Sequence, residues 1–155
     1  MKKALVTGAS GFIGQALCSR LMNEGWHLRV LLLQEARGPW HETVIGDLKN
    51  SLPDHSLNNI DVVFHLAGKA HALSKTRQDD EEYFQINTEG TRKLLEAAQE
   101  AGVRRFVFFS SVKAMNEGGP ECLDEASPCH PVTPYGKSKL EGEHLVLKEN
   151  MFRNR

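Results

Sequence analysis

The sequence predicts an α/β fold: a doubly wound parallel sheet of about five strands with helices on both faces. Short apolar runs of strand length alternate with segments of helical periodicity, and glycines separate many of them. Parallel strands need right-handed crossovers between them, so this alternation favours a sheet that is covered on both faces. The chain has 155 residues, 40% hydrophobic and 25% charged, which is enough for one domain with its own core, residues 1–155.

The first half of the chain supplies four of the predicted strands. Residues 4–6 form an apolar run that stops in a glycine turn, and a helix over 12–24 follows until Gly25 ends it. The apolar spacing predicts that this helix buries Ile13, Ala16, Leu17 and Leu21. The next three strands are predicted at residues 28–33, 43–45 and 61–65.

The second half begins with the longest periodic segment, which predicts one helix over 79–101 that stops at Gly102. Its predicted inner face is Phe84, Asn87, Thr91, Leu94, Leu95 and Ala98. A fifth strand follows at 105–109. Four prolines within 116–134 predict a long exposed loop, and long ordered loops are commonly functional. A last helix is predicted from Pro134 to about residue 149.

Composition excludes several classes of protein. Lys and Arg number 19 against 20 Asp and Glu, and this balance argues against a nucleic-acid partner. The apolar runs are too short for a membrane span, and the N-terminal one is too short for a signal peptide. Three cysteines without paired metal spacing, of which Cys18 is expected to be buried on a helix, suit a reducing cytoplasm. His65 and His71 lack further ligands at metal spacing, so we expect structural histidines and no metal site.

A glycine-rich turn joins the first strand to the first helix. Gly8 permits a tight exit from the strand, Gly11 lets a pyrophosphate approach the backbone, and Gly14 allows close packing of the helix. The free amides and the dipole at the start of the helix attract phosphate. A glycine triplet alone also fits a plain turn between a strand and a helix. Here both flanking elements are predicted, which favours dinucleotide binding.

The residues after the second strand leave the choice between NAD and NADP open. An acidic residue that binds the adenosine ribose is expected there, but the sequence has Leu32, Leu33 and Gln34. Glu35 could reach the ribose hydroxyls, whereas Arg37 could meet a 2′-phosphate. Each of these two can equally be a solvated loop residue.

Three residues form a candidate catalytic set. Tyr135 and Lys139 are four apart and share a helix face, and a lysine ammonium stabilises a phenolate, which suits Tyr135 as a general acid or base. Alone, the pair fits a surface Tyr and Lys better. Ser111 strengthens the catalytic interpretation, because it ends the fifth strand at the edge where ligands bind, although a strand-end cap and the neighbouring Ser110 are alternatives.

One polar residue and one pair of small residues are further candidates for the site. Asn87 lies on the apolar face of the long helix and needs a partner there. That partner is the sheet, the loop carrying Ser111 or a relay water. Ala67 and Gly68 end the fourth strand with small residues, which would let a cofactor ribose lie against the backbone.

Taken together, ordered motifs resemble a known family over nearly the whole chain. The motifs are Thr7-Gly8-x-x-Gly11-x-x-Gly14, Asp47-Leu48, His65-Leu66-Ala67-Gly68, Asn87-Thr88-x-Gly90-Thr91, Ser110-Ser111 and Tyr135-x-x-x-Lys139. This set resembles the extended short-chain dehydrogenase/reductases, which have a Rossmann fold. More narrowly, it resembles the NAD-dependent epimerase/dehydratases that act on nucleotide sugars.

The resemblance implies the roles of individual residues. Ser111, Tyr135 and Lys139 match the catalytic triad of a UDP-sugar 4-epimerase-like enzyme, in which Tyr takes a proton while hydride passes to nicotinamide. Contacts to NAD are implied for Gly8, Ser10, Gly11, Phe12, Ile13, Gly14, Asp47, Leu48, Ala67, Gly68, Asn87 and Lys139. A nucleotide-sugar substrate is implied as well, together with a homodimer through the helix over 79–101 and the last helix.

The chain departs from the family in two further ways. Residues 112–116 are Val-Lys-Ala-Met-Asn where the family usually has Val-Tyr-Gly, and the acidic pair of dehydratases is absent, which disfavours dehydration. No sixth apolar run follows the fifth strand, so we expect a chain truncated relative to the family, without the C-terminal substrate domain. The alternatives are an NADPH-dependent carbonyl reductase and a non-catalytic dinucleotide-binding module.

Overall fold

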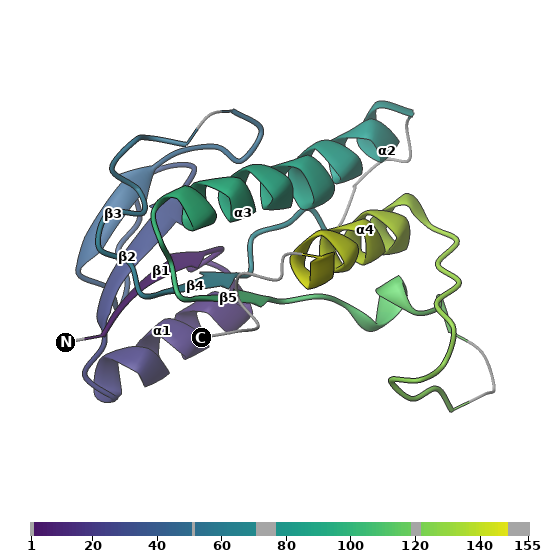
Figure 1. The fold of residues 1–155 in the computed structure, drawn as a ribbon, viewed down its shortest axis with the longest axis horizontal. Helices are drawn as coiled ribbons and strands as arrows, with labels where there is room; N and C mark the ends of the chain where they lie inside the picture. The colour runs from purple at the N-terminus through teal and green to yellow at the C-terminus, as the bar shows by residue number, and fades with distance from the viewer. Residues whose placement is uncertain (1, 51, 71–76, 119–121, 149–155) are drawn as a thin grey trace.

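The structure, a computed structural model, describes residues 2–50, 52–70, 77–118 and 122–148. Its elements run in the order β1 (Lys3–Thr7), α1 (Phe12–Asn23), β2 (His27–Leu32), β3 (Glu42–Ile45), β4 (Val62–His65), α2 (Arg77–Tyr83), the π-helix η1 (Phe84–Glu89), α3 (Gly90–Glu100), β5 (Arg105–Phe108), the 3₁₀ helix η2 (Val112–Ala114) and α4 (Pro134–Lys148). Figure 1 shows their arrangement.

The strands form one parallel five-stranded sheet in the order β3-β2-β1-β4-β5. From β1 the chain first builds outward through β2 and β3, and then returns to place β4 on the other side of β1. The direction of winding therefore reverses between β1 and β4, where Thr7 pairs with His65. In doubly wound sheets, ligands bind outside the carboxyl ends of the strands at this reversal. The predicted fold class is confirmed.

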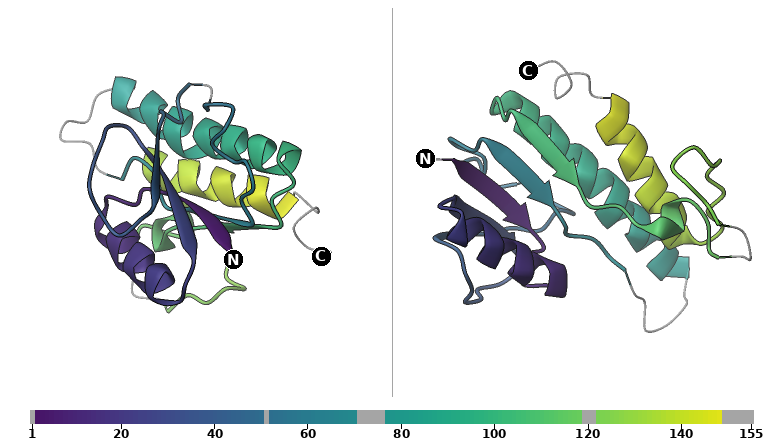
Figure 2. Two further views of the ribbon diagram at one scale, coloured as in Figure 1. Left: turned by 90° about the vertical axis from the view of Figure 1, so that its left-hand side faces the viewer. Right: turned by 90° about the horizontal axis from the view of Figure 1, so that it is seen from below.

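Helices cover both faces of the sheet (Figures 1 and 2). Alternation along β1 divides the core, because Leu5 packs with α3 while Ala4 and Val6 pack with α1. The α3 side contains Leu5, Leu31, Val44, Val63, Leu94, Leu95, Ala98 and Phe106, and the α1 side contains Ala4, Val6, Cys18, Leu21, Leu28, Val30 and Leu32. Cys18 is fully buried on its helix, as expected.

One predicted helix face and one predicted strand end differ from the structure. In α1 the buried residues are Gly14, Cys18 and Leu21, whereas Ile13 is 58% exposed and Ala16 is exposed as well. Gly14 packs directly against the glycine turn, and that contact rotates the helix away from the predicted face. The second strand ends at Leu32, and Leu33 is 72% exposed.

The single helix predicted over 79–101 contains a π turn. The amide of Gly90 donates to Gln85 O, five residues back, which is the π pattern. The Thr91 hydroxyl donates to Asn87 O at 2.6 Å and so provides a partner for a carbonyl in the widened turn. The predicted inner face holds, since Asn87, Thr91, Leu94, Leu95 and Ala98 are buried and Phe84 is half-buried.

A buried arginine ties β2 to the segment before β4. Arg29 Nε donates to Glu42 Oε2 at 2.6 Å, and Arg29 Nη1 donates to the carbonyls of His55, Ser56 and Asn58. Lys3 Nζ also contacts Glu42, and these partners, Lys3 foremost, lower the pKa of the Glu42 carboxyl to about 2. The charge of Arg29 is therefore paired although the residue lies inside the fold.

The segment between η2 and α4 is irregular where the structure describes it, at 115–118 and 122–133, as the prolines predicted. Glu117 anchors it by accepting from the amide of Thr133, and His130 N donates to Met115 O at 2.6 Å. Within the described part of the chain, no helix combines the length and apolar character needed to cross a bilayer.

Candidate functional site

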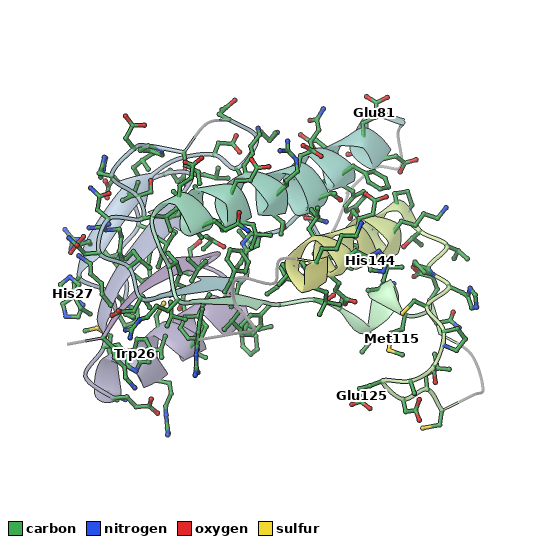
Figure 3. All side chains as sticks on the ribbon, in the orientation of Figure 1. Trp26, His27, Glu81, Met115, Glu125 and His144 are labelled. Atoms are coloured by element: carbon green, nitrogen blue, oxygen red, sulfur yellow. The ribbon has the colours of Figure 1, made fainter. Side chains whose placement is uncertain are left out.

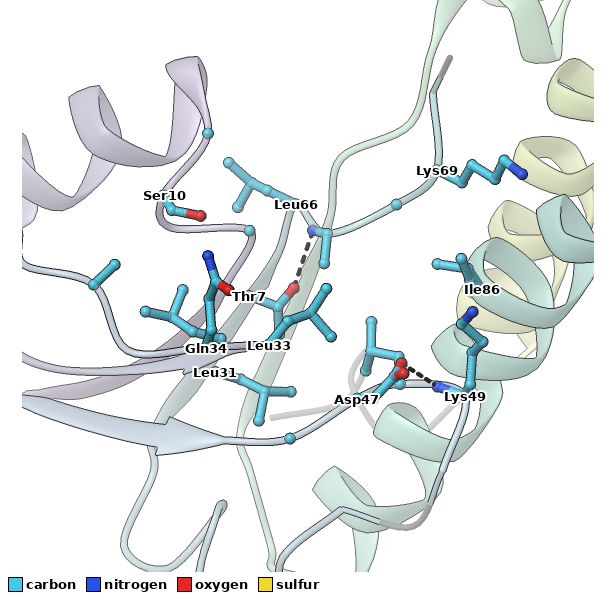
Figure 4. Close-up of a pocket in the computed structure, with 18 of the residues that line it drawn as sticks. Thr7, Ser10, Leu31, Leu33, Gln34, Asp47, Lys49, Leu66, Lys69 and Ile86 are labelled. Atoms are coloured by element: carbon cyan, nitrogen blue, oxygen red, sulfur yellow. Dashed lines mark hydrogen bonds between the residues drawn. The ribbon is translucent and has the colours of Figure 1, made fainter. Parts of the chain in front are cut away.

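A cavity of about 890 Å³ opens at the carboxyl ends of β1, β2, β3 and β4 (Figure 4). Its walls come from four loops, each of which directly follows a strand. They supply Thr7, Gly8, Ser10 and Gly11; Leu33, Gln34 and Ala36; Gly46, Asp47, Leu48 and Lys49; and Leu66, Ala67, Gly68 and Lys69. The cavity therefore spans the point at which the winding of the sheet reverses.

The glycine turn has the shape that the sequence predicts. Gly8 has a φ of 71°, and a Cβ there would lie 2.7 Å from Ala67 N. A Cβ on Gly14 would lie 2.1 Å from Gly8 O, so only glycine lets the helix approach this closely. No side chain caps the start of α1, and its first turn carries no acidic residue. The backbone amides at this end of the helix are thus available to an anion.

The remaining residues of the turn occupy different positions. Ser10 and Gly11 line the cavity, whereas Phe12 is 95% exposed and Ile13 is 58% exposed on the first turn of α1. A Cβ on Gly11 would meet Gly8 O at 3.3 Å, which is tight but not a clash with the rest of the fold. Gly11 therefore has no strong packing reason to be glycine.

A buried hydrogen-bond chain connects the two sides of the reversal point. Ala67 N donates to Thr7 Oγ1 at 3.1 Å, Thr7 Oγ1 lies 2.7 Å from His65 Nδ1, and His65 Nε2 lies 3.0 Å from Thr91 Oγ1. Complete burial, helped by the nearby charge of Lys139, lowers the pKa of His65 to about 3. His65 is thus a neutral structural histidine. His71 lies outside the described residues, and the part of the chain that is described holds no metal-ligand cluster.

Uncharged residues follow β2 at the cavity. Leu33, Gln34 and Ala36 line it, and neither Glu35 nor Arg37 is among the lining residues. Glu35 and Arg37 are both exposed. Of the three interpretations left open by the sequence, the one with Glu35 and Arg37 as solvated loop residues agrees with this placement.

Asp47 and Leu48 line the opposite wall. Asp47 Oδ1 accepts from Lys49 N at 2.9 Å, and Leu48 is buried in the core. Lys49 Nζ contacts Glu82 at 2.8 Å, and Lys69 Nζ contacts the same carboxylate at 2.6 Å. These ion pairs lower the pKa of Glu82 and fasten α2 to two of the cavity loops.

Asn87 is buried behind the cavity and does not line it. Its Oδ1 accepts from Lys69 N at 2.8 Å, and its Nδ2 donates to Lys69 O at 3.0 Å and to Ser138 Oγ at 3.0 Å. A Cβ on Gly68 would meet Asn87 Oδ1 at 2.9 Å. The partners of Asn87 are thus the loop after β4 and helix α4, which differ from the sheet, serine loop or water expected from the sequence.

Lys139 is buried on α4, with 5% of its surface exposed. Its Nζ donates to Phe109 O at 2.6 Å and lies 4.1 Å from the centroid of the Phe108 ring. Burial lowers the pKa of this ammonium to about 8, against the opposing charge of Glu143. The helix thereby fixes a cation at the carboxyl end of β5.

Ser111 and Tyr135 belong to two segments that are in contact. A Cβ on Gly136 would lie 2.3 Å from Lys113 O, so α4 begins directly against η2. Ser111 Oγ accepts from Lys113 N at 3.3 Å and caps η2, while Ser110 is exposed. The centroids of the Tyr135 and Tyr83 rings lie 5.9 Å apart. The fold thus gathers the segments of the three candidate catalytic residues at the carboxyl end of β5, beside the cavity rather than within its lining.

Comparison with known proteins shows the family of this chain. The family model described as NAD dependent epimerase/dehydratase family matches residues 4–151. The chain belongs to this family. The uncharacterized UDP-glucose epimerase YtcB of Bacillus subtilis is 32% identical, over 92% of this chain and 50% of its own length. The 3-beta-hydroxysteroid dehydrogenase of Mycolicibacterium neoaurum is 32% identical, over 96% and 43%.

Solved structures of family members agree with the fold. MoeE5 in complex with UDP-glucose and NAD superposes with a TM-score of 0.83 at 34% identity, over 99% of this chain and 50% of that one. The chain therefore spans half or less of the length of these relatives.

Three residues that shape the site were not predicted as site residues from the sequence of this chain. Gln34 and Thr7 line the cavity, and Ser138 holds Asn87. Thr7 and His65 lie at the ends of predicted strands, which is a usable signal for pairing across a parallel sheet. Nothing in the local pattern separates Gln34 from its neighbours Glu35 and Arg37.

Proposed function

We propose that the chain provides the cofactor half of an NAD-dependent nucleotide-sugar epimerase that resembles the UDP-sugar 4-epimerases. The observation that carries the proposal is the buried ammonium of Lys139 at the carboxyl end of β5, one helical turn after Tyr135 and beside the segment of Ser111. A dinucleotide-sized cavity with a glycine turn adjoins it. A UDP-glucose epimerase among the relatives and a neighbour in complex with UDP-glucose and NAD support the sugar substrate.

The residues at the cavity fit a dinucleotide. Gly8, Gly11 and Gly14, with Ser10 and the first-turn residues Phe12 and Ile13, would hold the diphosphate at the start of α1. Asp47 and Leu48 would contact the adenine, and Ala67 and Gly68 would border the ribose on the nicotinamide side. Asn87 would act on that ribose through the loop it binds. A nicotinamide ring supplies reversible hydride acceptance at a sugar carbon.

The three catalytic residues would act on the sugar hydroxyl. Tyr135 takes the proton of that hydroxyl, and the ammonium of Lys139 stabilises the negative charge that develops on the phenol oxygen. Ser111 donates a hydrogen bond to the same substrate oxygen. A bound nicotinamide would supply reversible hydride transfer, and Tyr135 would give the proton back to the sugar oxygen after the ketone has turned its opposite face, which would invert the carbon. The homodimer implied by the resemblance belongs to this proposal as well.

The 3-beta-hydroxysteroid dehydrogenase relative favours a second candidate, an oxidoreductase that acts on a hydroxyl or carbonyl of a non-sugar substrate. The same three residues would perform its proton transfer. The two functions differ in redox balance, because epimerisation regenerates the dinucleotide in each turnover, whereas the oxidoreductase changes it stoichiometrically.

The test combines dinucleotide binding with product analysis. NAD binding to the purified chain is measured by calorimetry, and conversion of UDP-glucose is followed with and without added dinucleotide. We expect Tyr135→Phe to bind NAD as the wild type does and to lose conversion. Net NAD reduction during turnover supports the oxidoreductase. NAD binding without turnover in both proteins supports a non-catalytic module, and absence of NAD binding contradicts the cofactor half of an epimerase.

A further inference from the structure

The end of the cavity next to β2 carries no charge of its own. Leu33, Gln34 and Ala36 form this wall directly after the strand, and Gln34 is the one polar side chain among the three. In Figure 4 the amide of Gln34 is directed into the cavity, toward the turn that carries Ser10. This is the position after the second strand at which an acidic residue selects NAD, or a nearby arginine selects NADP.

From this placement we infer that the chain accepts NAD and NADP with similar affinity, and that the Gln34 amide meets the adenosine ribose in both. The inference rests on the proposed dinucleotide binding. An amide can accept a hydrogen bond from the 2′-hydroxyl of NAD through Oε1, and it can donate one to the 2′-phosphate of NADP through Nε2. Gln34 therefore provides a partner for either form.

The other charges at the cavity add no preference. Its charged lining residues are Asp47, Glu82, Lys49 and Lys69, which balance in sign. Lys49 and Lys69 both contact Glu82, and Lys69 also contacts Asp79 at 2.9 Å. The cations are thus already paired with carboxylates. An added 2′-phosphate would therefore find no unpaired lysine among these lining residues, and Asp47, whose carboxylate accepts from the amide of Lys49, lies on the wall opposite Gln34.

Glu35 and Arg37 provide the matched controls, because they flank Gln34 in the sequence and are exposed outside the lining. If the wall is neutral as inferred, removing either charge leaves the ratio of the two affinities unchanged. If Arg37 reaches the 2′-phosphate instead, its loss weakens NADP binding alone.

The test is calorimetric titration of the purified chain with NAD and, separately, with NADP. We expect wild-type dissociation constants within about tenfold of each other. Gln34→Asp should weaken NADP binding by about tenfold or more and leave NAD binding within about threefold, because the carboxylate repels the 2′-phosphate. Gln34→Arg should shift the ratio in the opposite direction. Glu35→Gln and Arg37→Gln should keep the wild-type ratio.

Each contrary result has a defined meaning. A wild-type preference above about tenfold for either dinucleotide overturns the inference and leaves the proposed function standing. So does a selective loss of NADP binding in Arg37→Gln, or of NAD binding in Glu35→Gln, or an unchanged ratio in Gln34→Asp. Absence of binding by both dinucleotides overturns the proposed function together with the inference.

Discussion

Thr7 Oγ1 and His65 Nδ1 lie 2.7 Å apart across the reversal point of the sheet, in a buried hydrogen-bond chain whose proton positions follow from its other end, at Thr91. Thr91 uses its hydroxyl proton on Asn87 O, so His65 Nε2 must donate to Thr91 Oγ1. The neutral ring then accepts at Nδ1 from the Thr7 hydroxyl, whose oxygen accepts from Ala67 N. The loops on both sides of the reversal are thereby fixed by one imidazole.

This neutral histidine predicts acid sensitivity. The pKa of His65 falls from 6.5 to about 3 on folding, so below pH 6.5 the unfolded chain binds a proton that the folded chain excludes. Stability is therefore lost as pH drops from 6.5 toward 3, with a slope of about 1.4 kcal/mol per pH unit from this group. We expect urea denaturation to show this slope in the wild type between about pH 6 and 5, above the range in which the carboxyl groups titrate, and a smaller slope in His65→Gln.

The control for that prediction is His144→Gln, since His144 is exposed on α4 (Figure 3). It should leave the acid slope as in the wild type. Imidazole resonances provide a second measurement that does not depend on the variant folding. A wild-type His65 that titrates near pH 6.5 by NMR contradicts the buried neutral assignment.

Lys139 predicts that the stability of the fold changes at alkaline pH. Burial lowers the pKa of its ammonium from 10.5 to about 8, so between these values the unfolded chain holds a proton that the folded chain has lost. The folded form therefore gains stability as pH rises from 8 to 10.5, by about 3 kcal/mol from this group. Lys139→Met should lack that gain when unfolding is measured at pH 8 and pH 10.

The exposed Lys137→Met, two residues earlier on α4, is the matched control and should keep the gain. Equal changes in wild type and Lys139→Met between the two pH values would show that the folded ammonium titrates as it does in water. Measurements without dinucleotide keep this test independent of the proposed function.

Local pattern explains most of the fold, and tertiary contacts explain the differences. The strands and the parallel order follow from short apolar runs alternating with helical segments, and the inner face of α3 follows from its periodicity. The rotation of α1 does not, because it is determined by Gly14 against the turn. The π turn does not either, since the apolar spacing gives no sign of the hydrogen bond from Gly90 N to Gln85 O.

The candidate site shows the same division. Motif spacing located the glycine turn and the segments that the fold gathers at β5, because strand ends and helix turns have regular geometry. For the wall after β2 the sequence offered Glu35 or Arg37, and neither lines the cavity. A loop without periodicity gives no signal for which side chains line a cavity, and in the structure Leu33, Gln34 and Ala36 do so.

The hydrogen bonds of Asn87 predict a large stability loss when its amide is removed. Asn87→Ala leaves the amide and carbonyl of Lys69, and the Ser138 hydroxyl, without this partner in a buried region. Each unsatisfied buried group costs about 1–3 kcal/mol, so we expect a loss of about 3 kcal/mol in urea denaturation. Gln85→Ala, exposed on the same π-helix, should change stability by less than about 1 kcal/mol. Similar losses in both variants would contradict a specific role for the amide.

Two glycines of one turn predict different consequences for the same substitution. A methyl group on Gly14 would lie 2.1 Å from Gly8 O and 2.7 Å from Ala9 Cα, so helix and turn must separate. We expect Gly14→Ala to lose about 3 kcal/mol of stability or more, because these neighbours are backbone atoms that cannot rotate away. Thermal and urea unfolding measure this loss.

Gly11→Ala should keep the fold and lose the ligand. The backbone of Gly11 has φ −75° and ψ 171°, which alanine adopts readily, and the added methyl group meets only Gly8 O at 3.3 Å. Gly11 also lines the cavity at the uncapped start of α1, so the methyl group occupies space through which a diphosphate reaches the amides. We expect stability within about 1 kcal/mol of the wild type and NAD binding weaker by about tenfold or more in calorimetry. Unchanged NAD affinity in a folded Gly11→Ala would place the diphosphate away from this turn, because no other effect of the methyl group compensates for a blocked approach.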